Sequence, residues 1–346
     1  MEKRGKFSNK IGFVLAAAGS AVGLGNIWRF PYLAAKYGGG TFLLVYLILA
    51  VTFGFSLMIA EISIGRKTGL SAIQAFKKLD KRFSCVGYLA AIIPIIIFPY
   101  YSVIGGWVIK YLVTFATHNG VDAAGDSYFT GFVSGTTEPL IYFLIFIVFT
   151  AVVVWFGVEK GIEKVSKFMM PVLVVLTIFI AVYGLTIDGA MDGLSYYLKP
   201  RLEDFSFKTV VSAMGQLFYS MSLAMGIMIT YGSYMKKENN LESSVRQIEF
   251  FDTAIAFFAG LMIIPAVFAF SGGDKAALGK GPSLMFVTLP KVFDSMPFGQ
   301  VIAAVFFILV LFAALTSAIS LMETIVSIFC DKLGWSRHKA CLIVFI

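Results

Sequence analysis

Charged residues and histidines are scarce in this chain of 346 residues. Lys, Arg, Asp and Glu make up 14% of it, whereas a soluble domain carries about a quarter. The sequence contains no HExxH, GxSxG or GxxxxGK pattern, and its two histidines are isolated. We therefore expect neither a hydrolase nor an ATP-driven pump, and the protein is predicted not to be an enzyme.

Cysteine is equally rare. The three cysteines, Cys85, Cys330 and Cys341, lie near the ends of apolar segments, without a CxxC pair or a neighbouring histidine cluster. This pattern gives only weak support for a disulfide bond or a zinc site.

Apolar residues are what the chain has in excess: they make up 58% of it, and 35 residues are Phe. This composition predicts an all-α integral membrane protein. A helix needs about 20 mainly apolar residues to cross a bilayer. Eight segments meet this requirement, at residues 11–37, 41–64, 83–115, 140–156, 168–186, 207–235, 251–270 and 298–330. A ninth begins near Ala340.

The formal charge of +8 could suggest a nucleic-acid partner, but no basic run is interleaved with solvated aromatic residues. Of the 28 Lys and Arg, 19 fall in five alternate connecting segments: 1–10, 66–82, 159–167, 236–249 and 331–339. The connection at 118–138 has none. This alternation predicts a multi-pass protein of the cell membrane, embedded in lipid, with a cytoplasmic N-terminus and no nucleic-acid partner.

Two predicted spans carry residues that interrupt helices. The first contains Gly19, Gly23 and Gly25 next to Asn26. The sixth contains polar residues between two glycines, in the stretch GQLFYSMSLAMG at 215–226. A serine in a membrane helix is equally explained by a bond to its own preceding turn. However, the first break opens one set of five spans and the second break opens another set. Because five is odd, the two sets have opposite orientations in the membrane. This arrangement predicts an inverted-repeat (5+5) transporter fold with broken first and sixth helices.

The repeats would cover about 11–186 and, incompletely, 207–346, within a single transmembrane domain spanning 1–346. Backbone groups freed by a break are tolerated in a membrane only around an enclosed site, typically for an ion or a polar substrate. We therefore expect a binding site where the two breaks meet.

Further polar residues lie in the later spans. Asp252, near the start of the seventh, is costly to bury as a carboxylate unless a cation or donor compensates it; alternatively, it is solvated at the inner surface. Thr316 and Ser317, in the eighth, could direct hydroxyl oxygens at a hard cation, although their spacing alone does not favour this.

These residues lie in motifs that resemble the neurotransmitter:sodium symporter family, which includes the bacterial leucine transporter. The motifs are AAAGSAVGLGNIWRFPYLAAKYGGGTFL at 16–43, AEISIGR at 60–66, SLAMGIMITYGSY at 222–234 and AALTSAIS at 313–320. Family members have eleven or twelve spans. The resemblance therefore implies a C-terminally truncated copy that covers about eight spans and the start of a ninth.

The resemblance implies two sodium sites. The residues matching the first are Ala21, Asn26, Ser220 and Asp252. The residues matching the second are Gly19, Val22, Ala313, Thr316 and Ser317. The family usually has Asn at position 252, and its animal members bind chloride nearby. We hypothesise that the fixed charge of Asp252 replaces chloride, so that chloride is not required.

The implied substrate is an amino acid. Matching contact residues are Ala21, Gly23, Gly25, Tyr101, Tyr219, Ser222 and Met225, with Leu24 and Ile97 walling the side-chain pocket. Monoamine-transporting relatives have Asp where this chain has Gly23, whereas Gly leaves room for an α-carboxylate. Met225 replaces a frequent Phe and adapts to varied apolar shapes. The expected substrate is hydrophobic or aromatic.

The resemblance also places gates. Arg29 would close the outer side with an acid of the tenth span, which this sequence does not contain. Arg4 and Asp331 would form an inner ion pair supported by Tyr234; alternatively, they are two unrelated surface charges. Glu61 is expected to brace the broken helices.

The resulting hypothesis is a sodium-coupled symporter that imports an amino acid by alternating access. The alternative is a truncated, non-transporting binder of sodium and an amino acid. The particular amino acid, the sodium stoichiometry, proton antiport and the oligomeric state stay open.

Overall fold

The computed structural model describes residues 5–117, 119–274 and 282–346, which are helical with short connections and contain no strand. Six helices in these ranges are long and apolar enough to cross a membrane: Gly40–Thr68, Lys81–Ala116, Thr137–Trp155, Val158–Leu185, Leu241–Ser271 and Gly299–Leu333. Their principal segments are α3 (Gly40–Leu49) with α4 (Phe55–Thr68), α6 (Ser84–Ala116), α9 (Thr137–Trp155), α10 (Lys164–Leu185), α14 (Leu241–Ser271) and α16 (Gly299–Leu333).

The first predicted span is a broken helix. It consists of α1 (Lys10–Ala21) and a second half made of η1 (Gly25–Arg29) and α2 (Phe30–Lys36), with a bend of 51° between the halves. Asn9 caps α1 by accepting a hydrogen bond from the Gly12 N–H. The non-helical residues 22 and 23 lie within the glycine-rich stretch expected to unwind.

The sixth predicted span is interrupted over a longer stretch. Six residues, 221–226, separate the end of helix α12 (Phe207–Ser220) from the start of α13 (Ile227–Tyr234). Between them, Ser222, Ala224 and Gly226 have φ of 54°, 60° and 71°. This left-handed backbone is favourable for glycine and unfavourable for the other two residues, so the surrounding contacts must hold it in place.

Two predicted boundaries are wrong. The fifth span begins with η4 (Val158–Glu163), ten residues earlier than expected, and the seventh with Leu241, also ten residues earlier. Both extensions are polar enough to resemble connections. They are nevertheless helical because protein groups stabilise them: the buried Glu163 accepts a 2.7 Å hydrogen bond from the Ser8 N–H, and Asn240 caps α14.

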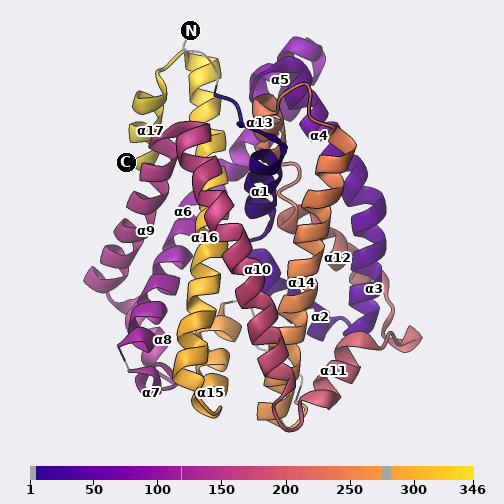
Figure 1. Cartoon of the computed structure of the whole chain (residues 1–346), viewed down its shortest axis with the longest axis vertical. Helices are drawn as coiled ribbons and strands as arrows, with labels where there is room; N and C mark the ends of the chain where they lie inside the picture. The colour runs from indigo at the N-terminus through magenta and orange to yellow at the C-terminus, as the bar shows by residue number, and fades with distance from the viewer. Residues whose placement is uncertain (1–4, 118, 275–281) are drawn as a thin grey trace.

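Short helices cover the two ends of the bundle (Figure 1). Helices α5 (Ala72–Leu79), α13 and α17 (Arg337–Phe345) lie at the end that carries the N-terminus. Helices α7 (Gly120–Ala123), α8 (Tyr128–Ser134), α11 (Ala190–Leu198) and α15 (Leu289–Asp294) lie at the other end.

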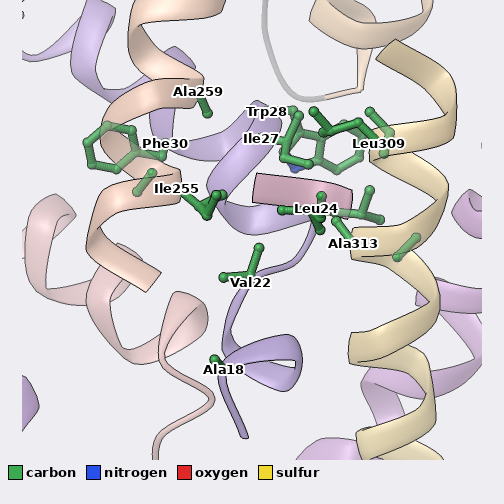
Figure 2. Close-up of a cluster of buried hydrophobic side chains, with 14 of the residues drawn as sticks. Ala18, Val22, Leu24, Ile27, Trp28, Phe30, Ile255, Ala259, Leu309 and Ala313 are labelled. Carbon is green, nitrogen blue, oxygen red and sulfur yellow. The ribbon is translucent and has the colours of Figure 1, made fainter. Parts of the chain in front are cut away.

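The first break lies at the centre of the bundle. Helix α1 packs against α10, α14 and α16. Figure 2 shows the extended chain at Val22, with Ile255 and Ala259 of α14 on one side and Ala313 of α16 on the other. The apolar walls fix the ends of both half-helices, so the backbone groups at the break are held in place rather than exposed to lipid.

Candidate functional site

A small internal cavity of about 30 Å³ lies where the two breaks meet. It is walled by residues of α1 and η1, α6, α16 and the segment between α12 and α13. The lining residues are Ser20, Ala21, Gly23, Gly25, Ile97, Tyr101, Tyr219, Ser220, Ser222, Met225, Ile227, Ser317, Ser320 and Leu321. All seven residues expected to contact substrate belong to this set. Leu24, which was expected in the wall, does not.

Two glycines allow close packing at this cavity. A Cβ atom on Gly23 would lie 2.5 Å from Ser317 Oγ and 2.8 Å from the Tyr101 hydroxyl oxygen. A Cβ atom on Gly25 would lie 2.7 Å from Tyr219 Cδ1. The Tyr101 hydroxyl also accepts a hydrogen bond from the Leu24 N–H at 3.1 Å, which leaves its own proton available to a ligand. The break therefore has no room for an aspartate at position 23.

Four buried side chains form what we call the Asp252 cluster: Asn26, Tyr46, Ser220 and Asp252. Asp252 Oδ1 accepts hydrogen bonds from Asn26 Nδ2 at 2.8 Å and from Ser220 Oγ at 2.7 Å. Its Oδ2 accepts one from the Tyr46 hydroxyl at 3.2 Å. The carboxylate is thus surrounded by donors from η1, α3 and α12, and it is buried rather than solvated at the inner surface.

Asn26 orients this cluster. Its Oδ1 accepts a hydrogen bond from the Gly23 N–H at 3.0 Å, while its amide nitrogen faces Ser220 and Asp252. A half-turn of the amide would exchange the two atoms and direct three oxygens at one point. Ala21, the remaining expected ligand, ends α1 at the same cavity.

The second group, the Ser317 cluster, joins α1 to α16 through Gly19, Val22, Ala313, Thr316 and Ser317. Ser317 Oγ lies 3.4 Å from the Val22 carbonyl oxygen and 3.1 Å from that of Ser20. Thr316 Oγ1 lies 3.2 Å from the Ala313 carbonyl oxygen, within its own helix. A Cβ atom on Gly19 would lie 3.2 Å from Thr316 Cβ, so the two backbones are close. All five expected residues are therefore adjacent.

Serine hydroxyls line the cavity beyond these two clusters. Ser20 Oγ donates to Ser320 Oγ at 2.6 Å, and Ser222 Oγ donates to the Ser20 carbonyl at 3.1 Å. The sequence analysis did not identify Ser20 or Ser320. Ser320 lies inside the AALTSAIS motif, three residues after Ser317, and this helical spacing is a signal that could have indicated it.

On the side of α2, Arg29 does not reach an acid in the described residues; its Nη1 donates to Gln216 Oε1 at 2.9 Å, and its guanidinium lies 5.3 Å from the centroid of the Tyr219 ring. Gln216 Nε2 in turn donates to the Gly25 carbonyl at 2.8 Å. Gln216 therefore links α12 of the sixth span to η1 of the first span beside the cavity. This role was not predicted.

On the other side, Arg4 lies outside the described residues. Asp331 accepts a 2.6 Å hydrogen bond from the Ser71 N–H. The Tyr234 hydroxyl donates to Glu323 Oε1 at 2.6 Å, and Glu323 forms a buried ion pair with Arg337 of α17. The pairing of Glu323 with Arg337 was not predicted.

Glu61 contacts the second break. Its Oε1 accepts a 2.6 Å hydrogen bond from the N–H of Ala224, which has the left-handed backbone described above. This contact is the bracing geometry expected of Glu61.

The sequence matches the model of the sodium:neurotransmitter symporter family over residues 4–130 and 132–346. The uncharacterized sodium-dependent transporter YhdH of Bacillus subtilis is 38% identical over 331 residues, which cover 94% of this chain and 72% of YhdH. An uncharacterized sodium-dependent transporter of Haemophilus influenzae is 33% identical over 357 residues, 99% of this chain and 77% of that protein.

Among solved structures, MhsT in complex with L-phenylalanine has a TM-score of 0.91 at 39% identity, with 99% of this chain and 78% of that chain covered. The fold expectation, an all-α transporter with broken first and sixth helices, is confirmed by this similarity. The chain belongs to the sodium:neurotransmitter symporter family, whose members are sodium-dependent membrane transporters and not enzymes.

Proposed function

We propose that this protein imports a hydrophobic or aromatic amino acid together with sodium by alternating access. The observation that carries the proposal is the cavity between the two breaks, which is lined by all seven expected substrate residues and adjoins both polar clusters. The similarity to MhsT, solved with L-phenylalanine, supports the class of substrate.

The α-carboxylate is assigned to the η1 end of the cavity. Helix η1 begins at Gly25 and continues into α2, so its N-terminal N–H groups and positive dipole end face the cavity. The Tyr101 hydroxyl has a proton to donate on the same side. An amine without a carboxylate would place no negative charge at this positive helix end, and the tight contacts of Gly23 leave no space for a compensating acid.

The substrate side chain would lie against Ile97, Met225, Ile227 and Leu321, which form the apolar part of the lining. The cavity has room for about two water molecules. Binding therefore requires side-chain movement, for which the unbranched Met225 is well suited.

We assign one sodium ion to the Asp252 cluster and a second to the Ser317 cluster. In the first, Asp252 supplies the charge, and the half-turn of the Asn26 amide replaces a donor with an oxygen ligand. In the second, the carbonyls at the end of α1 and the hydroxyls of Thr316 and Ser317 supply neutral oxygens, the ligand type that hard cations prefer. Ala21 and Gly23 border both a cluster and the cavity, so binding of ion and substrate stabilise each other.

Chloride is not required in this scheme. Asp252 would supply the negative charge from within the first cluster, where three hydrogen bonds stabilise its carboxylate when sodium is absent. An additional anion beside it would be repelled.

Alternating access would open the cavity toward α2 or toward α13. The contacts to be broken are those of Arg29 with Gln216 on one side and those of Tyr234 with Glu323 on the other. The excess of basic residues at the end carrying the N-terminus supports a cytoplasmic N-terminus. Within the single domain, a bundle of the first, second, sixth and seventh spans would move against the third, fourth and eighth spans.

The test is uptake of radiolabelled amino acids into proteoliposomes under an inward sodium gradient, with potassium in place of sodium as the control. The expected result is saturable, sodium-dependent uptake of a hydrophobic or aromatic amino acid, undiminished when gluconate replaces chloride. Sodium-dependent binding without uptake would contradict transport, and binding without sodium dependence would contradict the site assignment.

A further inference from the structure

Helix α5 lies at the end of the molecule that carries the N-terminus (Figure 1), and the helix and its flanks are rich in basic residues. Residues 66–82 hold six Lys and Arg and a single acid, Asp80. This surface, which we call the α5 basic face, consists of Lys67, Lys77, Lys78, Lys81 and Arg82, all exposed.

The α5 basic face is held rigidly. Helix α5 buries Ala72, Ile73 and Ala75 against α6 and its neighbours, and the Ser71 N–H before the helix donates to Asp331 at 2.6 Å. With one face of the helix fixed on the bundle, Lys77 and Lys78 are directed to the outside.

The charges of this face are mostly not used inside the protein. Asp80 is paired with Arg82, whose hydrogen bonds hold the pKa of Asp80 below its usual range. Lys78 reaches the Thr68 carbonyl at 3.1 Å. Within the described residues, Lys77 and Lys81 have no recorded acceptor.

Three basic residues in other connections at this end are bonded to protein groups. Lys236 donates to the Ser8 carbonyl at 2.6 Å, Arg246 is paired with Glu242 at 2.7 Å, and Lys167 is paired with Glu163 at 2.6 Å. Exposed basic side chains occur in these connections too, but residues 66–82 carry five of them in one short segment.

Exposed apolar residues lie directly beside the α5 basic face. Leu79 is 43% exposed and Phe83 is 55% exposed, and Val86 and Leu89 continue the apolar surface along the start of α6. Tyr88 on the same helix is also exposed, and Lys332 of α16 lies 4.6 Å from the centroid of its ring. Exposed hydrocarbon at the start of a spanning helix marks the depth at which lipid acyl chains give way to headgroups.

We propose that the α5 basic face is a binding site for the headgroups of anionic phospholipids. The ammonium groups meet the phosphate and the net negative charge of the headgroup, while Leu79 and Phe83 contact the upper acyl chains. A soluble anion or a nucleic acid would use the charges but not the adjoining apolar residues. The site does not depend on the identity of the transported substrate.

The experiment uses the full chain reconstituted in phosphatidylcholine bilayers with a trace of spin-labelled phosphatidylglycerol or spin-labelled phosphatidylcholine. The fraction of motionally restricted label gives the relative association of the two lipids. We expect the wild type to favour phosphatidylglycerol by about threefold or more. The triple variant Lys77→Gln, Lys78→Gln, Lys81→Gln should reduce the preference to near unity.

The matched control removes the same charge from exposed lysines of the same end, as Lys160→Gln, Lys164→Gln, Lys237→Gln, and should keep the preference. The corresponding Lys→Arg triple of the α5 basic face should keep it too, and it shows that the site tolerates substitution. Equal losses in the glutamine triple and its control, absence of a preference in the wild type, or displacement of the lipid by inorganic phosphate would each overturn the proposal.

Discussion

The Asp252 cluster and the Ser317 cluster differ in how they are held before any ion binds. Asp252 supplies an ionisable carboxyl group, and its oxygens already have three side-chain donors from separate elements. The Ser317 cluster is neutral and consists of carbonyls at the end of α1 beside hydroxyls of one helix. The Asp252 cluster is therefore pre-formed, and a cation must take the place of its hydrogen-bond donors. The spacing of the oxygens in the Ser317 cluster instead depends on where the end of α1 lies.

This difference predicts that the two clusters respond unequally to substitutions. Electrostatics should dominate the first cluster, and backbone position should dominate the second. The following predictions test this comparison, from the largest expected effect to the smallest.

Asp252→Asn removes the charge and keeps the shape. We expect the sodium concentration for half-maximal amino-acid binding to rise about 100-fold, or about 2.7 kcal/mol, because a unit charge beside a buried cation is lost. Sodium titration of binding in chloride-free buffer measures this.

The matched control is Glu242→Gln, which removes an exposed acid from the same helix and should leave the titration unchanged. If Asp252 replaces chloride, adding chloride should restore part of the sodium affinity of Asp252→Asn and have no effect on the wild type. An unchanged sodium titration in Asp252→Asn would refute the assignment of sodium to this cluster.

Gly23→Ala tests the role of backbone position. The added methyl would lie 2.5 Å from Ser317 Oγ and 2.8 Å from the Tyr101 hydroxyl oxygen, so either these side chains or the backbone of the break must shift. We expect amino-acid affinity to fall about 20-fold, within the range of about 1–3 kcal/mol typical of overpacking. Equilibrium binding at saturating sodium measures the loss.

Gly215→Ala is the control because a Cβ atom on Gly215 meets nothing within 4 Å. It should bind as the wild type does. Equal affinities of Gly23→Ala and the wild type would show that the break is looser than these contacts indicate.

Ser317→Ala removes one neutral ligand from the second cluster. The expected rise in half-maximal sodium concentration is about fivefold, corresponding to about 1 kcal/mol for a neutral polar contact. Thr324→Ala, which removes a buried hydroxyl bonded only within α16 in the described residues, serves as the control. A loss in Ser317→Ala as large as that in Asp252→Asn would remove the distinction between the two clusters.

The sequence was informative about the breaks and the residues beside them. Clustered glycines at 19–25 and polar residues at 215–226 are local signals, and the non-helical residues 22–23 and 221–226 lie within these two stretches. The helix boundary at Val158 was less accessible, because a contact with Ser8, distant in the sequence, stabilises the polar turn there. The boundary at Leu241 has a local signal, the cap Asn240, which was missed among the polar residues of that connection.

Partners from other helices were also not predictable. Gln216 and Glu323 are polar residues in apolar spans, but their partners, Arg29 and Arg337, follow from three-dimensional packing. Tyr46 is the clearest example, because an aromatic residue in an apolar span predicts only a buried or lipid-facing ring.

Tyr46→Phe tests whether that overlooked hydroxyl belongs to the Asp252 cluster functionally. The 3.2 Å hydrogen bond to Asp252 Oδ2 holds the carboxylate without supplying charge. Its loss should raise the half-maximal sodium concentration by about threefold, within the range of about 0.5–1.5 kcal/mol for one hydrogen bond. Tyr197→Phe, which removes another buried hydroxyl bonded to the α14 backbone at 3.1 Å, should affect stability without changing the sodium titration. If both variants shift the titration equally, the effect comes from the packing of α14 and not from the orientation of the carboxylate. A shift confined to Tyr46→Phe would mean that the charged cluster depends on its hydrogen-bonded frame as well as on its charge.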